Sequence, residues 1–188
     1  ASAPPIQKGN EKNDQMMIGI LGQVMEIHNS ESIHHISRVQ RITSILLERL
    51  CQKTDIYGLS GMDRYLITTA SALHDIGKVA IDDRILNAHD LTPEQTAILH
   101  THPILGAQML ENLSQYQDEP LVKFAIQICR WHHERWDGSG YPDGRKGDDT
   151  PIAAQVVALA DAYDGLTGKR DKREALSQEE AVAALTAG

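Results

Sequence analysis

Apolar residues that recur every three to four positions constrain the fold of this chain more than any other feature. Val39, Ile42, Leu46 and Leu50 form one such stripe, and residues 152–166 carry another. Side chains on this spacing share one face of an α-helix, which buries that face against its neighbours. Segments that alternate apolar and polar residues, as half-buried β-strands do, are scarce. The sequence therefore predicts an all-α fold, a single domain of about seven to nine helices.

Local start signals place several helices along the chain. Ser30 is a candidate N-cap for the stripe at 39–50, and Ser177 with Glu180 forms a capping-box pattern. Thr92 is followed by a proline, the residue favoured at the first helical position. Further helices are expected over residues 16–27, 66–73, 103–114 and 120–131.

The composition argues against some classes of protein. The net charge of −8 argues against binding of polymeric nucleic acid or of an anionic membrane surface. No apolar run reaches the ~18–20 residues that a membrane span needs. The chain has two cysteines, which is typical of a reduced, cytoplasmic protein rather than of a disulfide scaffold. Residues 1–14, with two prolines and few apolar groups, are expected to be a tail or linker before one domain over 15–188.

Histidines and carboxylates gather in five separate segments of the chain, which has nine histidines. The residues are Glu31 with His35, His74 with Asp75, His102, His132 with His133, and Asp161 with Asp164. Mixed imidazole and carboxylate ligands suit Fe, Mn or Zn better than Ca or Mg. Two ions about 3.5–4 Å apart can activate water and hold the oxygens of a displacement at phosphorus. The residues therefore favour metal-dependent hydrolysis of a phosphate ester.

Each of these groups also has a purely structural interpretation. Glu31 and His35 could lie on a solvent-exposed helix face, four residues apart. His132 and His133 could end a helix, where cations interact well with the helix dipole. Asp161 and Asp164 could lie on a solvent-exposed helix face. The coincidence of all five segments favours the metal interpretation.

Five segments, in this order, resemble the HD-GYP family, a branch of the HD-domain metal-dependent phosphohydrolases. They are ESIHHISRV (31–39), HDIGKVAIDDRIL (74–86), HPILG (102–106), HHERWDGSGYPDG (132–144) and ADAYDGLTGKR (160–170). HDIGK together with HHERWDGSGYP is a specific combination, whereas the pair His-Asp alone is not. The resemblance implies a helical domain that binds two or three metals and hydrolyses cyclic di-GMP to pGpG, with further hydrolysis to GMP as an option.

The resemblance also implies which residues bind the metals. One metal would be bound by His35, His74, Asp75 and Asp161. Asp75 would bridge to a second metal, completed by His102, His132 and His133. Glu31 stands where a carboxylate supports a third metal in some members. Fe or Mn is the favoured metal, with Ni and Zn as alternatives.

The substrate residues are assigned in the same way. Asp75 and Lys78 would be catalytic, and Lys78 would contact the scissile phosphate; the alternative is a solvated lysine at a helix end. Tyr141 resembles the substrate-loop tyrosine, which either stacks on a base or only packs the loop. Arg170 and Arg173 resemble a pair that holds phosphate or guanine. The three glycines of the loop predict a flexible wall that a dinucleotide can approach closely.

Some positions depart from the family pattern, and these departures bear on substrate preference. Asp171 follows Arg170 where a proline is frequent, and Gln155 stands where an arginine is frequent. The chain also ends earlier than the resemblance leads us to expect, as a fragment would. Two other functions compete with the phosphodiesterase: a slow module that senses cyclic dinucleotides, and a general HD nucleotide phosphohydrolase. The expected partners are cyclic di-GMP and an upstream sensor or receiver domain, and a homodimer is compatible with the sequence.

Overall fold

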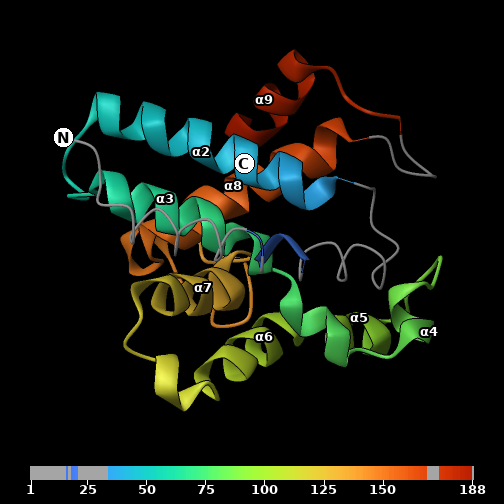
Figure 1. The fold of residues 1–188 in the computed structure, drawn as a ribbon. Coiled ribbons are helices and arrows are strands. Elements are labelled where there is room, and N and C mark those ends of the chain that lie inside the picture. The colour runs from blue at the N-terminus through green and yellow to red at the C-terminus, as the bar shows by residue number, and fades with distance from the viewer. Residues whose placement is uncertain (1–15, 17, 21–33, 169–173, 188) are drawn as a thin grey trace.

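The computed structural model describes residues 16, 18–20, 34–168 and 174–187, and every regular element assigned within them is helical (Figure 1). The α-helices are α2 (His35–Lys53), α3 (Gly61–Ala70), α4 (Asp83–Leu86), α5 (Pro93–Leu99), α6 (His102–Glu111), α7 (Pro120–Trp131), α8 (Ile152–Thr167) and α9 (Gln178–Ala187). The short 3-10 helices are η1 (Ser71–Leu73), η2 (Ile76–Ala80), η3 (Ser114–Tyr116) and η4 (Gly147–Asp149). The predicted all-α fold is therefore confirmed.

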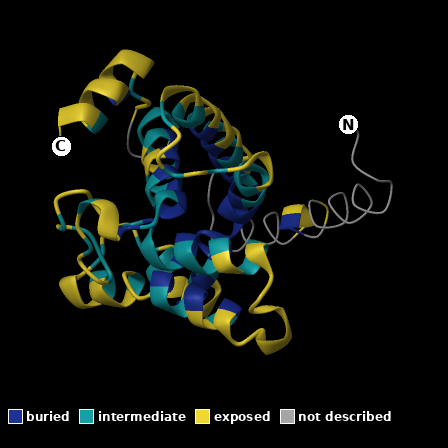
Figure 2. Ribbon diagram, turned by 90° about the vertical axis from the view of Figure 1, so that its left-hand side faces the viewer, coloured by how far each residue is buried: buried dark blue, intermediate teal, exposed yellow. Residues whose placement is uncertain are grey.

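Four helices surround the core. Helix α2 packs against α3 and α8, and α7 packs against the same two helices, so that the four close a ring (Figure 1). Helix α6 lies on α7, α9 lies on α8, and the short helices α4 and α5 contact each other at one end of the molecule. Figure 2 shows the buried residues gathered between the helices, while the helix beside the C-terminus is largely exposed. The core is aliphatic and includes Val39, Leu47, Ile67, Ala125, Ile128 and Val157.

The helix start predicted at Thr92 and the capping box predicted at Ser177 are confirmed, and they begin α5 and α9. The hydroxyl of Thr92 accepts from the backbone N–H of Gln95 at 3.2 Å, and the Gln95 side chain accepts from the Thr92 N–H at 2.9 Å. Ser177 and Glu180 make the same reciprocal pair at 3.2 and 2.9 Å. These caps satisfy backbone donors that the first helical turn leaves unpaired.

Other helix ends differ from the prediction. The candidate cap Ser30 lies outside the described residues, as do residues 1–14 and most of 16–27; α2 begins after His34, whose φ is 77°. Helix α6 ends at Glu111, short of the expected residue 114, and a 3-10 turn follows it. No helix within the described part of the chain is long and apolar enough to cross a membrane.

A glycine brings the HDIGK segment against α6. A Cβ built on Gly77 would lie 2.0 Å from the carbonyl oxygen of His102 and 2.5 Å from the backbone nitrogen of Gly106. Real Cβ atoms do not approach so closely, so η2 can lie on α6 only because Gly77 has no side chain. This contact sets Asp75, at the start of η2, beside His102, at the start of α6.

Candidate metal centre

Side chains from five parts of the chain converge where α2, α6, α7, α8 and the turn between η1 and η2 meet. The predicted ligands among the described residues are His35 on α2, His74 and Asp75 in the turn, His102 on α6, His132 and His133 at the end of α7, and Asp161 on α8. Of the other predicted site residues, Glu31, Arg170 and Arg173 lie outside the described residues.

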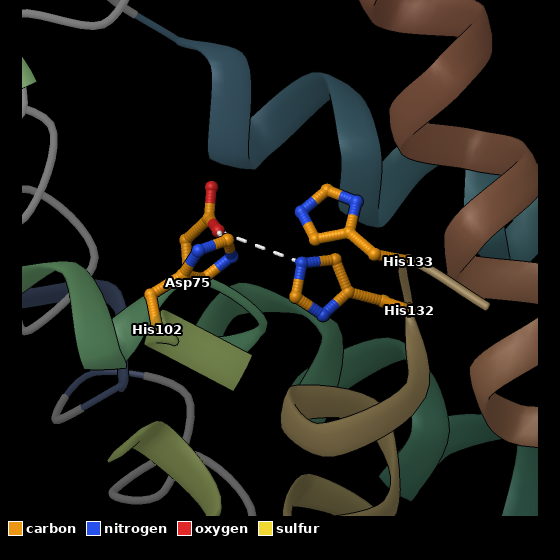
Figure 3. A group of neighbouring side chains, drawn as sticks. All are labelled: Asp75, His102, His132 and His133. Atoms are coloured by element: carbon orange, nitrogen blue, oxygen red, sulfur yellow. Dashed lines mark ion pairs between the residues drawn. The ribbon is translucent and has the colours of Figure 1, made fainter. Parts of the chain in front are cut away.

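Asp75 lies beside His102 and faces His132 and His133 (Figure 3), and its distances to further side chains place it at the centre of the group. Its Oδ1 lies 3.1 Å from Nε2 of His102 and 3.5 Å from Nε2 of His132. Its Oδ2 lies 3.2 Å from Nε2 of His74 and 2.6 Å from Nζ of Lys78. Oδ1 therefore faces His102 and His132, whereas Oδ2 faces His74 and Lys78.

The candidate ligands form two clusters that share Asp75. The potential ligand atoms of Asp75, His102, His132 and His133 all lie within 4.8 Å of one another, and those of His35, His74 and Asp75 do the same. Asp161 lies at the edge of the second cluster, with its Oδ1 3.6 Å from Nε2 of His35. The division matches the two ligand sets of the sequence analysis, and metal binding by these residues stays a prediction.

Backbone carbonyls set the orientation of three of the imidazoles. Nδ1 of His74 lies 2.8 Å from the carbonyl oxygen of Ser71. Nδ1 of His102 lies 2.7 Å from the carbonyl oxygen of Leu99, which is also three residues earlier in the chain. Nδ1 of His132 lies 3.0 Å from two carbonyl oxygens of α7. A carbonyl accepts only, so Nδ1 must carry the proton and Nε2 presents a lone pair. This is the arrangement in which histidines bind metals through Nε2.

The acceptors that meet at Asp75 need a cation between them. Nε2 of His102, Nε2 of His132 and Oδ1 of Asp75 are buried and make no hydrogen bond to the described residues. With the protons on Nδ1, each contact between Nε2 and Oδ1 joins two lone pairs. Buried polar groups in native proteins normally have a partner. A divalent cation bound by all three would supply it, so the residues fit the predicted metals.

The protonation states also suit metal binding. Burial opposes ionisation of Asp75, yet Lys78 and His74 overcome this and hold its pKa well below the usual value. Burial lowers the pKa of His132 and, with His132 beside it, the pKa of His133. The site therefore offers an ionised carboxylate at Asp75, and burial favours the neutral imidazole at His132 and His133. Lys78 is only 18% exposed and bound to Asp75, so the alternative of a solvated lysine is wrong.

Asp164 is a site residue whose role the sequence analysis did not assign. Its Oδ2 accepts from Nδ1 of His35 at 2.8 Å, and its carboxylate also accepts from Nε and Nη2 of Arg38 at 2.5 and 3.0 Å. It is buried, so the interpretation of a solvated face is wrong for Asp164. Burial opposes ionisation, but His35 and Arg38 hold its pKa at about 2. The three-residue spacing from Asp161 was the only local signal, and it does not show which partner each aspartate faces.

Asparagine at position 164 is expected to weaken metal binding by about 10- to 100-fold, the usual cost of losing a partner that orients a ligand histidine. The amide cannot accept equally from His35 and Arg38, so His35 loses its fixed orientation. Metal affinity measured by competition with a chelator checks this. Asp148→Asn, at an exposed carboxylate, is the matched control. Equal affinities for Asp164→Asn and wild type would show that Asp164 only stabilises the fold.

Glu134 fixes the loop that follows the paired histidines, a role that its sequence context does not indicate. Its buried carboxylate accepts from three successive backbone N–H groups, at residues 143–145, at 2.7, 3.1 and 2.9 Å. Asp143 in turn accepts from Arg130 and from the indole N–H of Trp131, at 2.8 and 2.7 Å. These contacts hold the loop onto the end of α7, so the prediction of a flexible wall is wrong.

Gly140 has a packing role in the same loop. A Cβ there would lie 2.5 Å from the carbonyl oxygen of His133 and 2.5 Å from the backbone nitrogen of Arg135. The missing side chain thus lets the loop lie against its own backbone. The peptide bond between Tyr141 and Pro142 is cis, and the Tyr141 N–H donates to the His133 carbonyl at 3.2 Å. Tyr141 is therefore held beside the candidate ligand His133.

Proteins with similar sequences and structures belong to a family of metal-dependent enzymes, as the geometry of the site suggests. Residues 22–188 match the family described as HD domain. The chain therefore belongs to the HD domain family. Its HDIGK and GYP segments, with the relatives below, place it in the HD-GYP branch of that family.

The similar curated proteins are bacterial phosphodiesterases. The chain is 36% identical to a probable cyclic di-GMP phosphodiesterase of Vibrio cholerae, over 95% of this chain and 41% of that protein. It is 34% identical to a cyclic di-GMP phosphodiesterase of Thermotoga maritima, over 88% of this chain and 42% of that protein. It is 37% identical to the 3'3'-cGAMP-specific phosphodiesterase 2 of Vibrio cholerae, over 85% of this chain and 29% of that protein. The chain thus spans less than half the length of each of these relatives.

A solved structure shares the fold. Bd1817, an HDG"Y"P protein from Bdellovibrio bacteriovorus, superposes with a TM-score of 0.62 at 26% sequence identity. The match covers 94% of this chain and 56% of that protein. The helical arrangement around the candidate metal centre is therefore that of an HD-GYP protein.

Proposed function

We propose that this domain is a metal-dependent phosphodiesterase that hydrolyses cyclic di-GMP to pGpG, with GMP as a further product. The observation that carries the proposal is Asp75, which both candidate ligand clusters share and which lies 2.6 Å from Lys78. A shared carboxylate suits two ions held side by side, the arrangement used for displacement at phosphorus. The names of the relatives from Vibrio cholerae and Thermotoga maritima support the substrate.

The two clusters favour two ions, and Fe or Mn is the proposed metal, with Ni or Zn as alternatives. Glu31 would support a third ion, in line with its place in the HD-GYP pattern. When bound, the ions would polarise the phosphoryl oxygens and lower the pKa of water. Asp75 would bridge the ions, His102, His132 and His133 would complete one set, and His35, His74 and Asp161 the other.

The chain's own cations would act on the phosphate. Lys78 is held at the centre by Asp75, and its ammonium group would neutralise charge that grows on the phosphoryl oxygens. The planar guanidinium groups of Arg170 and Arg173 would bind phosphate or a guanine edge with two hydrogen bonds each. Tyr141, fixed beside His133, would shape the wall on the other side of the substrate.

A second cyclic dinucleotide is a specific alternative substrate. The chain is 37% identical to a 3'3'-cGAMP-specific phosphodiesterase. Gln155 and Asp171 also depart from the HD-GYP pattern where an arginine and a proline are frequent. These differences alter the charge near the substrate and leave the ligand set intact. Substrate preference between cyclic di-GMP and 3'3'-cGAMP is therefore the first comparison to make.

The decisive experiment is a hydrolysis assay on anaerobically purified protein with its metal content measured. Separate preparations with Fe(II), Mn(II) and Ni(II) receive cyclic di-GMP, 3'3'-cGAMP and a panel of ordinary nucleotides. Linear pGpG from cyclic di-GMP is the expected result. Inactivity in all three preparations would contradict the proposal, and tight binding without turnover would favour a sensing module. Preference for ordinary nucleotides would favour a general HD phosphohydrolase.

We also propose a cellular location, a neighbouring domain and an oligomeric state for this domain. A cytoplasmic location fits the substrate and the free cysteines Cys51 and Cys129. An upstream sensor or receiver domain and a homodimer are proposed for the full-length protein. Fusion to such a domain would let an input control hydrolysis, and mass measurement of the full-length protein in solution tests the dimer.

A further inference from the structure

Two histidine rings already stack on the ring of Tyr141. The His100 ring lies 3.9 Å from it, centroid to centroid, with an interplanar angle of 10°. The His133 ring lies 4.8 Å away at 26°. His133 is also a candidate metal ligand. Tyr141 is therefore poorly placed to offer its ring to a nucleobase.

Trp136, in the same loop, is placed differently. It is 65% exposed, the greatest exposure of an aromatic side chain in the described part of the chain. The Gly147 N–H donates to the Trp136 carbonyl at 3.0 Å, and a Cβ at Gly147 would lie 3.8 Å from the indole ring. The backbone of η4 thus supports the indole without covering it. An exposed tryptophan held in this way offers a flat apolar surface, which soluble proteins usually bury or use for binding.

Trp136 lines a pocket of about 690 Å³ between the loop, α8 and α9. Ligand pockets for small molecules usually measure ~300–1,000 Å³. Asp161 also lines the pocket, and its Oδ1 lies 3.6 Å from Nε2 of the candidate ligand His35. The pocket therefore reaches the edge of the candidate metal centre, where the phosphate would be bound.

The pocket wall also carries a fixed amide. The Gln155 side-chain NH2 donates to the carbonyl of Thr150 at 2.7 Å and to that of Gly147 at 3.5 Å, and all three residues line the pocket. These bonds set the orientation of the Gln155 side chain. The side-chain carbonyl oxygen of Gln155 can accept from the N–H groups on the edge of a purine base. An aromatic face and an oriented amide in one pocket match the chemistry of a purine.

We propose that Trp136 is the stacking residue for a purine base of the cyclic dinucleotide, which enters the pocket between the loop, α8 and α9. Gln155 faces the edge of the base, and the adjoining phosphate lies at the metal centre beside Asp161. This inference rests on the proposed function, because it takes a cyclic dinucleotide as the substrate. It assigns base recognition to Trp136 and leaves Tyr141 to shape the loop.

The kinetic test compares Trp136→Ala and Trp136→Phe with wild type in the metal-loaded full-length protein. Loss of a base–aromatic stack is expected to raise KM roughly 5- to 150-fold in Trp136→Ala, with kcat and metal content near wild type. Trp136→Phe keeps an aromatic face and is expected to restore most of the affinity. Tyr116→Ala, at an exposed tyrosine on η3, is the matched control and should leave KM unchanged.

A binding test measures the contact between Trp136 and the base in the absence of hydrolysis. GMP and ribose 5-phosphate carry the same phosphate, but only GMP has a base. GMP is expected to quench tryptophan fluorescence in wild type and not in Trp136→Phe, whose remaining Trp131 is engaged by Asp143 and Arg145. Ribose 5-phosphate should quench neither protein.

The outcomes separate this inference from the proposed function. If wild type hydrolyses a cyclic dinucleotide but Trp136→Ala keeps its KM, the base does not stack on Trp136. Quenching that persists in Trp136→Phe would also overturn the inference. A change in oligomeric state with an unchanged KM would assign the indole to a protein interface instead. A wild-type protein without activity on any cyclic dinucleotide would contradict the proposed function itself.

Discussion

Alanine at position 75 is expected to remove most of the bound metal and to lower the phosphodiesterase rate by more than about 100-fold, beyond the cost of losing a supporting partner. Asp75 is the one residue common to both candidate clusters, so a single change takes a ligand from each. It also neutralises Lys78, which it contacts at 2.6 Å. Metal analysis of the purified variant and the cyclic di-GMP assay measure the two effects.

Two further variants separate loss of metal from loss of fold. Asp75→Asn keeps the shape of the side chain and removes its charge, and it should fail to load metal while unfolding in one transition. Asp118→Ala, at a fully exposed carboxylate, should match wild type in metal content and rate. Full metal loading of Asp75→Ala would refute the bridging role.

The candidate donor groups stand out in the sequence because histidines and carboxylates gather in five short segments, but their division into two ligand sets came from the resemblance to the HD-GYP family. The hydrogen-bond partner of a candidate ligand cannot be identified in the same way. Asp164 meets His35 across 129 residues of chain and Arg38 across 126, and only the packing of α2 on α8 brings them together.

Helix starts show the same contrast. The caps at Thr92 and Ser177 use residues three positions apart, so the sequence alone predicts them. The loop after α7 could not be predicted in the same way. Its glycines suggested flexibility, but the carboxylate of Glu134 binds three backbone N–H groups up to eleven residues later. Nothing in the pattern of the loop shows that an acidic side chain turns inward there.

Alanine at Gly77 is expected to destabilise the protein by about 1–3 kcal/mol, the usual cost of overpacking, and to reduce metal loading as well. The added methyl would meet the carbonyl of His102 at 2.0 Å, so η2 and α6 must move apart. Because Asp75 lies on one side of this contact and His102 on the other, their 3.1 Å approach is lost with it. In a domain of this size, Tm should fall by about 2–4 °C for each kcal/mol.

Gly61→Ala is the matched control for this substitution. Gly61 is the first residue of α3, and the nearest atom to a Cβ there, at 3.7 Å, is at the end of the Arg64 side chain. Alanine at this position should be neutral or slightly stabilising, because it restricts the unfolded chain. Thermal unfolding and metal content of both variants are measured together. If Gly77→Ala lost stability but bound metal as wild type does, the contact between η2 and α6 would support the fold without setting the distance between Asp75 and His102.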